Sequence, residues 1–85
     1  MPAGYRVFLT SRALKDWKGL PQDVRRAVGL AIDRLARKGR GAGVRKLGSA
    51  GWRLRVRDYR ILFEVDDGER TITIYRIRHR REAYR

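Results

Sequence analysis

Hydrophobic and polar residues alternate strictly from Trp52 to Arg57, and this is the clearest pattern in the chain. Trp52, Leu54 and Val56 occupy every second position. Three arginines fill the positions between and after them: Arg53, Arg55 and Arg57. Because successive side chains of a strand point to opposite faces, the pattern predicts a half-buried strand with one apolar and one basic face. Arginines on that face would be spaced by about 6.6–6.8 Å, similar to the separation of adjacent phosphates on a nucleic-acid strand.

Three further segments have the composition of strands. Residues 5–10, 59–65 and 70–77 are rich in aromatic and β-branched residues. The acidic and glycine-containing residues 66–69 predict a hairpin turn between the last two strands. An acidic metal site is the alternative interpretation of this turn, but no other metal ligands accompany its carboxylates. The basic segment 44–47 precedes the arginine strand and is expected to extend its positive charge.

Two segments have helical periodicity. The first, about residues 11–18, begins after a capping residue, Thr10 or Ser11, and places Leu14 and Trp17 toward the core. The second, residues 20–38, has Pro21 in its first turn and an apolar stripe with a 3.6-residue period. The stripe comprises Val24, Val28, Ala31, Ile32 and Leu35. The glycine-rich residues 39–43 lack a Gly-Lys-Ser/Thr ending, so we interpret them as a connector rather than a phosphate loop.

These elements predict one small α+β domain over residues 1–85, with the order β-α-α-β-β-β. Short links between the last three strands favour an antiparallel meander. The two amphipathic helices are expected to cover one face of this sheet. The arginines would then lie on the uncovered face, where a solvated basic surface is the alternative to a binding site.

Composition narrows the possible partners. The chain has 22 lysine and arginine residues against 9 acidic residues, a net charge of +13, which predicts attraction to polyanions. It has no cysteine and one histidine, so disulfides and Cys- or His-rich metal sites are excluded. No apolar run approaches the roughly 20 residues of a membrane span, and the N-terminus has no signal-peptide hydrophobic region. We therefore expect a cytoplasmic protein without a metal or other cofactor.

Several short motifs, taken in order, resemble toxins of the RelE/ParE superfamily of bacterial toxin–antitoxin systems. They are residues 12–15 after the first strand, Leu20-Pro21, residues 45–47, residues 52–61 and the C-terminal residues 77–84. The resemblance implies the β-α-α-β-β-β fold. For the RelE branch it also implies an endoribonuclease that cuts messenger RNA, typically in the ribosomal A site, and a cognate antitoxin.

The resemblance also implies the site. Its catalytic residues correspond to Arg53, Arg55, Arg60, His79, Arg80, Arg81 and Tyr84. Further contacts to RNA phosphates are expected from Arg45, Lys46, Arg57 and Arg78. Lysines occupy the positions of Arg53 and Arg55 in the best-known RelE sequence, whose chain also continues beyond the tyrosine.

Metal-independent RNA cleavage uses the ribose 2′-OH as nucleophile and leaves a 2′,3′-cyclic phosphate. Arginine stabilises the charge that develops on the phosphate, but its very high pKa prevents it from transferring protons near neutral pH. That task would fall to His79, Glu82 or Tyr84. Stacking on a base is the alternative role for Tyr84, and structural hydrogen bonding is the alternative role for His79.

Two other functions compete with RNA cleavage. The ParE branch poisons DNA gyrase and does not cut RNA, and a non-catalytic RNA-binding module would bind RNA with a strong salt dependence. The charge of +13 further predicts that the antitoxin segment in contact with the toxin is acidic and disordered when free. Such a segment would cover the basic sheet or displace the C-terminal tail.

Overall fold

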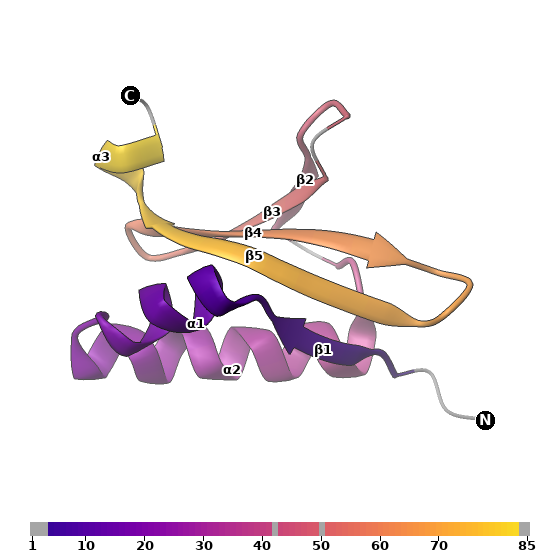
Figure 1. Ribbon diagram of the computed structural model, residues 1–85, viewed down its shortest axis with the longest axis horizontal. Coiled ribbons are helices and arrows are strands. Elements are labelled where there is room, and N and C mark those ends of the chain that lie inside the picture. Colours follow the sequence, from indigo (N-terminus) through magenta and orange to yellow (C-terminus); the bar gives the residue numbers. More distant parts are fainter. Residues whose placement is uncertain (1–3, 42, 50, 84–85) are drawn as a thin grey trace.

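The computed structural model describes residues 4–41, 43–49 and 51–83, and the side chains up to residue 81. Five strands form one sheet, two longer helices cover one of its faces, and a short third helix follows the last strand (Figure 1). The elements are β1 (Arg6–Leu9), α1 (Ser11–Lys18), α2 (Gln22–Lys38), β2 (Val44–Lys46), β3 (Trp52–Val56), β4 (Tyr59–Asp66), β5 (Thr71–His79) and α3 (Arg80–Ala83). The predicted α+β class and the two helices on one face are confirmed.

The sheet has the order β1-β5-β4-β3-β2. β2, β3, β4 and β5 form an antiparallel meander, whereas β1 pairs with β5 in parallel. The sheet is therefore mixed, and the prediction of an antiparallel sheet holds for four of its five strands. β2 was not predicted as a strand. It is a three-residue edge strand whose two basic residues, Arg45 and Lys46, are both exposed, so it lacks the apolar alternation that would reveal it.

The helix ends follow from local chemistry. The Thr10 hydroxyl accepts a hydrogen bond from the Ala13 N–H (3.1 Å) and caps α1. α2 begins after Pro21 and ends at Gly39, whose φ of 67° suits glycine. A Cβ atom at Gly39 would also lie 2.7 Å from the Tyr5 ring, so any other residue at this position would have to displace that ring.

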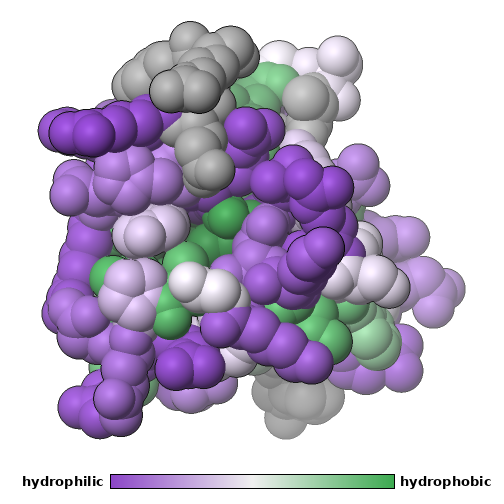
Figure 2. Space-filling model, turned by 60° about the vertical axis from the view of Figure 1, so that its left-hand side comes forward, coloured by the Kyte–Doolittle hydropathy of each residue, from purple (hydrophilic) through white to green (hydrophobic). Residues whose placement is uncertain are grey.

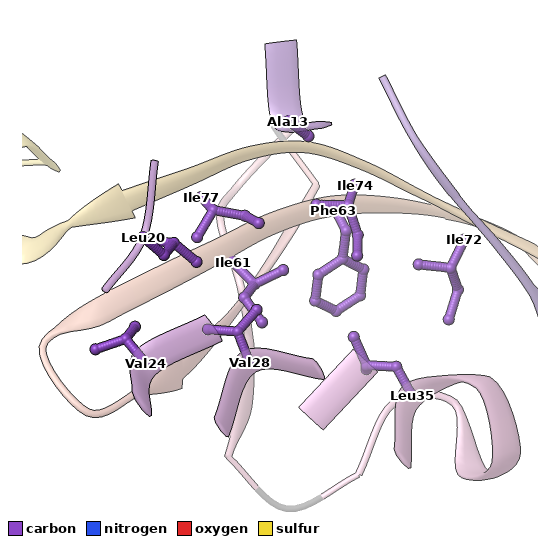
Figure 3. Packing of buried hydrophobic residues seen from close by; sticks show 10 residues of the cluster. All are labelled: Ala13, Leu20, Val24, Val28, Leu35, Ile61, Phe63, Ile72, Ile74 and Ile77. Carbon is purple, nitrogen blue, oxygen red and sulfur yellow. The ribbon is translucent and has the colours of Figure 1, made fainter. Parts of the chain in front are cut away.

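The core lies between the helices and the sheet (Figure 3). Ile61, Phe63, Ile72 and Ile74 are fully buried in β4 and β5, and Ile77 is nearly so. From the predicted stripe of α2, three residues are buried and two pack against the core at partial exposure, which confirms the stripe: Val24, Val28 and Leu35 in the first group, Ala31 and Ile32 in the second.

The prediction that Leu14 is a core residue is wrong. Its side chain is 43% exposed, whereas Ala13, one position earlier, is completely buried. Trp17 is half-buried and packs against the core, as expected. Ala13 and Trp17 are four residues apart and share the helix face that contacts β5, whereas Leu14 lies beside that face.

A carboxylate of α1 closes the part of the β5 edge that β1 does not reach. β1 pairs only with the first half of β5, from Thr71 to Ile74. Asp16 Oδ2 accepts hydrogen bonds from the Ile77 N–H and from Arg76 Nε, both at 2.9 Å. The Asp16 carboxylate is 14% exposed, so it replaces a neighbouring strand at this edge and fixes the second half of β5.

A second polar cluster connects Tyr5 and Arg40 to the β4–β5 turn. Tyr5 donates its hydroxyl hydrogen to Asp67 in the β4–β5 turn (2.7 Å), and Arg40 forms an ion pair with the same carboxylate (3.0 Å). Arg70 stacks over the Tyr5 ring at 4.4 Å. The hydrogen bonds from Tyr5 and Arg40 lower the pKa of Asp67, and the hydrogen bond to Asp67 raises the pKa of Tyr5. The predicted hairpin turn is confirmed, and its carboxylate has a structural role.

In the described parts of the chain, no helix combines the length and apolar character needed to cross a membrane.

Candidate functional site

Five neighbouring arginines on the sheet face opposite α1 and α2 are here called the arginine face: Arg45, Arg53, Arg55, Arg60 and Arg78. Arg76, opposite Leu62, is paired instead with Asp16 at the sheet edge. Strand register places the five together. Arg45 is directly opposite Arg53, and Arg60 is directly opposite both Arg55 and Arg78. Directly opposite residues have Cβ atoms about 4.5–5.5 Å apart, so the five side chains form two adjoining rows. The neighbouring alternate positions, such as Leu54 and Ile61, face the core.

The arginines of this face differ in how far their side chains are buried. Arg60, in the middle of its row, is only 6% exposed and is the only charged residue buried in the described structure. Arg53 and Arg78 are half-buried, and Arg45 and Arg55 are exposed. A buried central guanidinium with exposed neighbours makes a rigid base surrounded by accessible charge, an arrangement suited to binding a phosphate.

The ion pairs of the described residues join carboxylates to arginines outside this face. The described ion pairs join Arg40 to Asp67, Arg57 to Asp23, Arg76 to Asp16 and Arg80 to Asp58. Within the described residues, Arg45, Arg53 and Arg55 form no ion pair with a carboxylate. Glu64 is on the same side of the sheet but beyond Leu62, opposite Thr73. Like charges placed directly opposite one another destabilise a sheet, so the arginine face has a cost in folding.

Three residues of the predicted site lie elsewhere. β3 ends at Val56, and Arg57 follows in the turn with φ 55°, where it forms a 3.0 Å ion pair with Asp23 of α2. Arg57 is therefore not the third member of the alternating row. Lys46 is opposite Trp52 and rests 4.7 Å from its ring, on the side of the helices.

His79 is the third of these residues. It is opposite Tyr59, which packs against the core, and it therefore belongs to the sheet face that the helices cover. The histidine and the arginine face are on opposite sides of the sheet. The β5 bulge opposite Leu62 and Phe63 inserts one extra residue and so shifts the alternation of the strand. Ile77 and His79 therefore follow Ile74 on the covered face.

α3 contains two more arginines, Arg80 and Arg81. It contacts β4 and β5 and lies on the side of the sheet away from α1 and α2 (Figure 1). Arg80 and Arg81 are exposed on it. The Arg80 N–H donates to the Asp58 carbonyl oxygen at 2.7 Å, and Arg80 Nε lies 3.8 Å from the Asp58 carboxylate. The site prediction at Tyr84 lies outside the described residues.

Hydrophilic residues cover most of the end of the molecule at which α3 and the β3–β4 turn lie, with hydrophobic atoms visible only in gaps between them (Figure 2).

A hollow of about 570 Å³ lies on the helix-covered side of the sheet, between α2 and strands β2 and β3. Leu30, Ala31, Val44 and Leu54 are among its apolar lining residues. Basic residues are also part of its lining: Arg34, Arg37, Lys38 and Arg55. Neither the hollow nor the 66% exposure of Leu30 was predicted from the sequence.

Comparison with solved structures defines the class of protein. The RelBE2 toxin–antitoxin complex of Mycobacterium tuberculosis contains a chain with a TM-score of 0.80 and 28% identity, with 91% of this chain and 99% of that chain covered. The archaeal RelE–RelB complex of Pyrococcus horikoshii gives a TM-score of 0.81 and 26% identity, with 91% and 96% covered. A free mutant of the Escherichia coli toxin RelE, at 20% identity and a TM-score of 0.79 over 95% and 88% of the two chains, shows the same fold.

The fold is thus that of RelE. The sequence model that describes the ParE toxin of type II toxin–antitoxin systems, parDE, matches residues 7–84. This chain belongs to that family, within the RelE/ParE superfamily, and is a toxin of the type II toxin–antitoxin class. No curated protein sequence matches it significantly.

Proposed function

We propose that this toxin is a metal-independent endoribonuclease that cleaves messenger RNA on the ribosome, in the cytoplasm. The observation that carries the proposal is the arginine face: five arginines in directly opposed positions, one of them 6% exposed, on the sheet face that α1 and α2 leave open. Repulsion among these groups opposes folding, and a bound RNA backbone relieves it. A surface that is costly to fold and complementary to phosphate is best explained by binding of nucleic acid.

The chemistry divides into three tasks. A base removes the proton from the 2′-OH, the 2′ oxygen forms a bond to the adjacent phosphorus, and the bond from phosphorus to the 5′ oxygen breaks as that oxygen takes up a proton. The products are a 2′,3′-cyclic phosphate and a new 5′-OH. Arg55, Arg60 and Arg78 form the row that we assign to the negative charge of the pentacoordinate transition state. Arg45 and Arg53 bind the neighbouring phosphate.

The C-terminal segment completes the proposed site. We assign Arg80 and Arg81 to it because they belong to α3, which lies on the side of the sheet away from α1 and α2 (Figure 1). We assign proton transfer or base stacking to Tyr84, because arginines hold their protons near neutral pH and His79 is on the opposite face of the sheet. The peripheral contacts proposed for Lys46 and Arg57 are to RNA segments that pass around the sheet edge.

The antitoxin is proposed to bind the hollow between α2 and β3. The structural relatives from M. tuberculosis and P. horikoshii are toxin–antitoxin complexes. The apolar floor near Leu30 and Leu54 fits the apolar side of an amphipathic segment, and the basic lining residues fit acidic side chains on its other side. Because Arg55 borders both the hollow and the arginine face, such a segment would also shield part of the RNA site.

The test is the cleavage of messenger RNA during translation. Purified toxin is added to translating ribosomes, cuts are mapped by primer extension, and the new 3′ ends are identified by mass spectrometry. We expect cuts that end in 2′,3′-cyclic phosphates and that are lost in the Arg60→Ala and Tyr84→Phe variants. Accumulation of gyrase–DNA cleavage complexes without RNA cuts would instead identify a gyrase poison. Salt-dependent RNA binding without cleaved ends would identify a non-catalytic binding module.

A further inference from the structure

We propose that His79 is a positioning residue that caps helix α3 and thereby holds Arg80 and Arg81 at the RNA site. This inference rests on the proposed RNA cleavage for its functional consequence. Its structural part stands on the contacts of His79, Tyr59 and Asp58 alone, and those can be tested without any RNA.

The imidazole is in the place of a capping side chain. His79 is the residue immediately before α3, and its Nδ1 accepts a hydrogen bond from the Arg81 N–H at 3.2 Å. The first N–H groups of a helix have no partner within the helix, and a side-chain acceptor at the preceding residue normally satisfies the second or third of them. Arg81 is the second residue of α3. In this contact Nδ1 is the acceptor, the part that a side-chain oxygen takes in the common caps.

Two neighbours fix the capping geometry. The Tyr59 ring meets the His79 ring edge-on, with centroids 5.1 Å apart and planes at 89°, which sets the orientation of the imidazole. The Arg80 N–H donates to the Asp58 carbonyl oxygen at 2.7 Å. The first two N–H groups of α3 are therefore both satisfied by groups at one end of the β3–β4–β5 meander, one by a side chain and one by the β3–β4 turn.

This arrangement conflicts with proton transfer by His79. Register places its side chain on the helix-covered face with Tyr59, whereas the arginine face is on the other side of the sheet. Its Nδ1 lone pair, the basic site of the neutral ring, is already used by the Arg81 N–H. A one-turn helix is marginal on its own, so its position depends on such external contacts. The residue that the sequence suggests as a base thus acts through α3.

The experiment compares His79→Ala with His79→Asn. Asparagine is among the best capping residues but cannot act as a base near neutral pH. We expect His79→Ala to increase exchange of the Arg81 amide about fivefold and to lower RNA cleavage by a similar factor, because a lost cap corresponds to about that factor. We expect His79→Asn to restore both values to near those of the wild type. Thermal unfolding of each variant confirms that the rest of the domain is folded.

Two results would overturn the proposal. A loss of cleavage of about 10²-fold or more in both variants, with Arg81 exchange unchanged, would identify His79 as a proton-transfer group. Unchanged Arg81 exchange in His79→Ala would show that the cap does not hold α3, whatever the cleavage rate. If the wild-type toxin cleaves no RNA, the proposed function fails, and amide exchange still decides whether His79 caps α3.

Discussion

Replacing Arg53 by glutamine should make the domain more stable and a weaker RNA binder at the same time. Arg53 is opposite Arg45 and two residues from Arg55 on the same face. Two unit charges about 7 Å apart in water repel by about 0.6 kcal/mol, so the two neighbours together contribute about 1.2 kcal/mol. Screening with a Debye length of about 8 Å reduces this sum to roughly 0.5 kcal/mol at physiological salt. Glutamine removes the charge and keeps most of the aliphatic stem.

Two assays measure these opposite effects. For a domain of this size, a gain of roughly 0.5 kcal/mol raises the melting temperature by about 2–4 °C at physiological salt. The gain should be larger at low salt, where the repulsion is less screened. In RNA titrations over a range of salt concentrations, loss of one phosphate contact reduces the slope of log K against log salt by about 0.7. Affinity should fall about tenfold, as expected for one charge-assisted hydrogen bond.

The matched control is Arg26→Gln. Arg26 is exposed on α2, in the layer that covers the opposite face of the sheet, and its replacement changes the net charge by the same one unit. Neither its melting temperature nor its salt slope should move as those of Arg53→Gln do. The reasoning is refuted if Arg53→Gln melts below the wild type and shares the salt slope of Arg26→Gln, because the arginine face would then be neither strained nor in contact with RNA.

Three further predictions concern stability and partner binding. Asp16→Ala removes the acceptor for the Ile77 N–H and Arg76 and should cost about 3 kcal/mol in urea unfolding, whereas Asp16→Asn, which keeps an acceptor oxygen, should cost about 1 kcal/mol. Because the folded state lowers the pKa of Asp67 from 3.8, this carboxylate stabilises the fold above pH 3.8 and ceases to do so as the pH falls through the lower folded value. The free energy of unfolding of Asp67→Asn should therefore decline less steeply with acid than that of the wild type, and parallel curves would contradict this. Leu30→Asp, at an exposed position, should leave the melting temperature unchanged and weaken calorimetrically measured antitoxin binding by tenfold or more; unchanged affinity would place the antitoxin elsewhere.

The predictable part of the fold is the part in which each element has a clear period. In α2 and in β3 the same hydrophobic period repeats over many residues, so tertiary packing does not override the element that the pattern predicts. Leu14 shows where this fails. In an eight-residue helix, Ala13 and Leu14 can both share an apolar face with Trp17, at spacings of four and three residues, so the period does not decide which of them is inside. β2 escaped prediction because a short edge strand needs no apolar face.

For the site, alternation correctly grouped Arg53 with Arg55, and register added Arg45, Arg60 and Arg78. Register depends on contacts between strands, so the sequence alone did not show that Arg60 is opposite Arg78. The bulge in β5 and the positive φ of Arg57 similarly move His79 and Arg57 off the row. The three-residue spacing from Ile74 to Ile77 marks the bulge in the sequence, whereas the turn at Arg57 interrupts an apparently regular alternation. Asp16 and Asp58, which position β5 and α3, are indistinguishable in the sequence from other surface carboxylates.

The most direct test of the central claim compares two double variants with equal charge. Arg53→Gln/Arg55→Gln removes two members of the arginine face, and Arg12→Gln/Arg26→Gln removes two exposed arginines of the helices that cover the other face. With messenger RNA on translating ribosomes, we predict that the first variant cleaves at least about 10²-fold more slowly than the wild type, while the second stays within about threefold. Equal rates for the two variants would contradict the assignment of the arginine face as the RNA-cleaving surface.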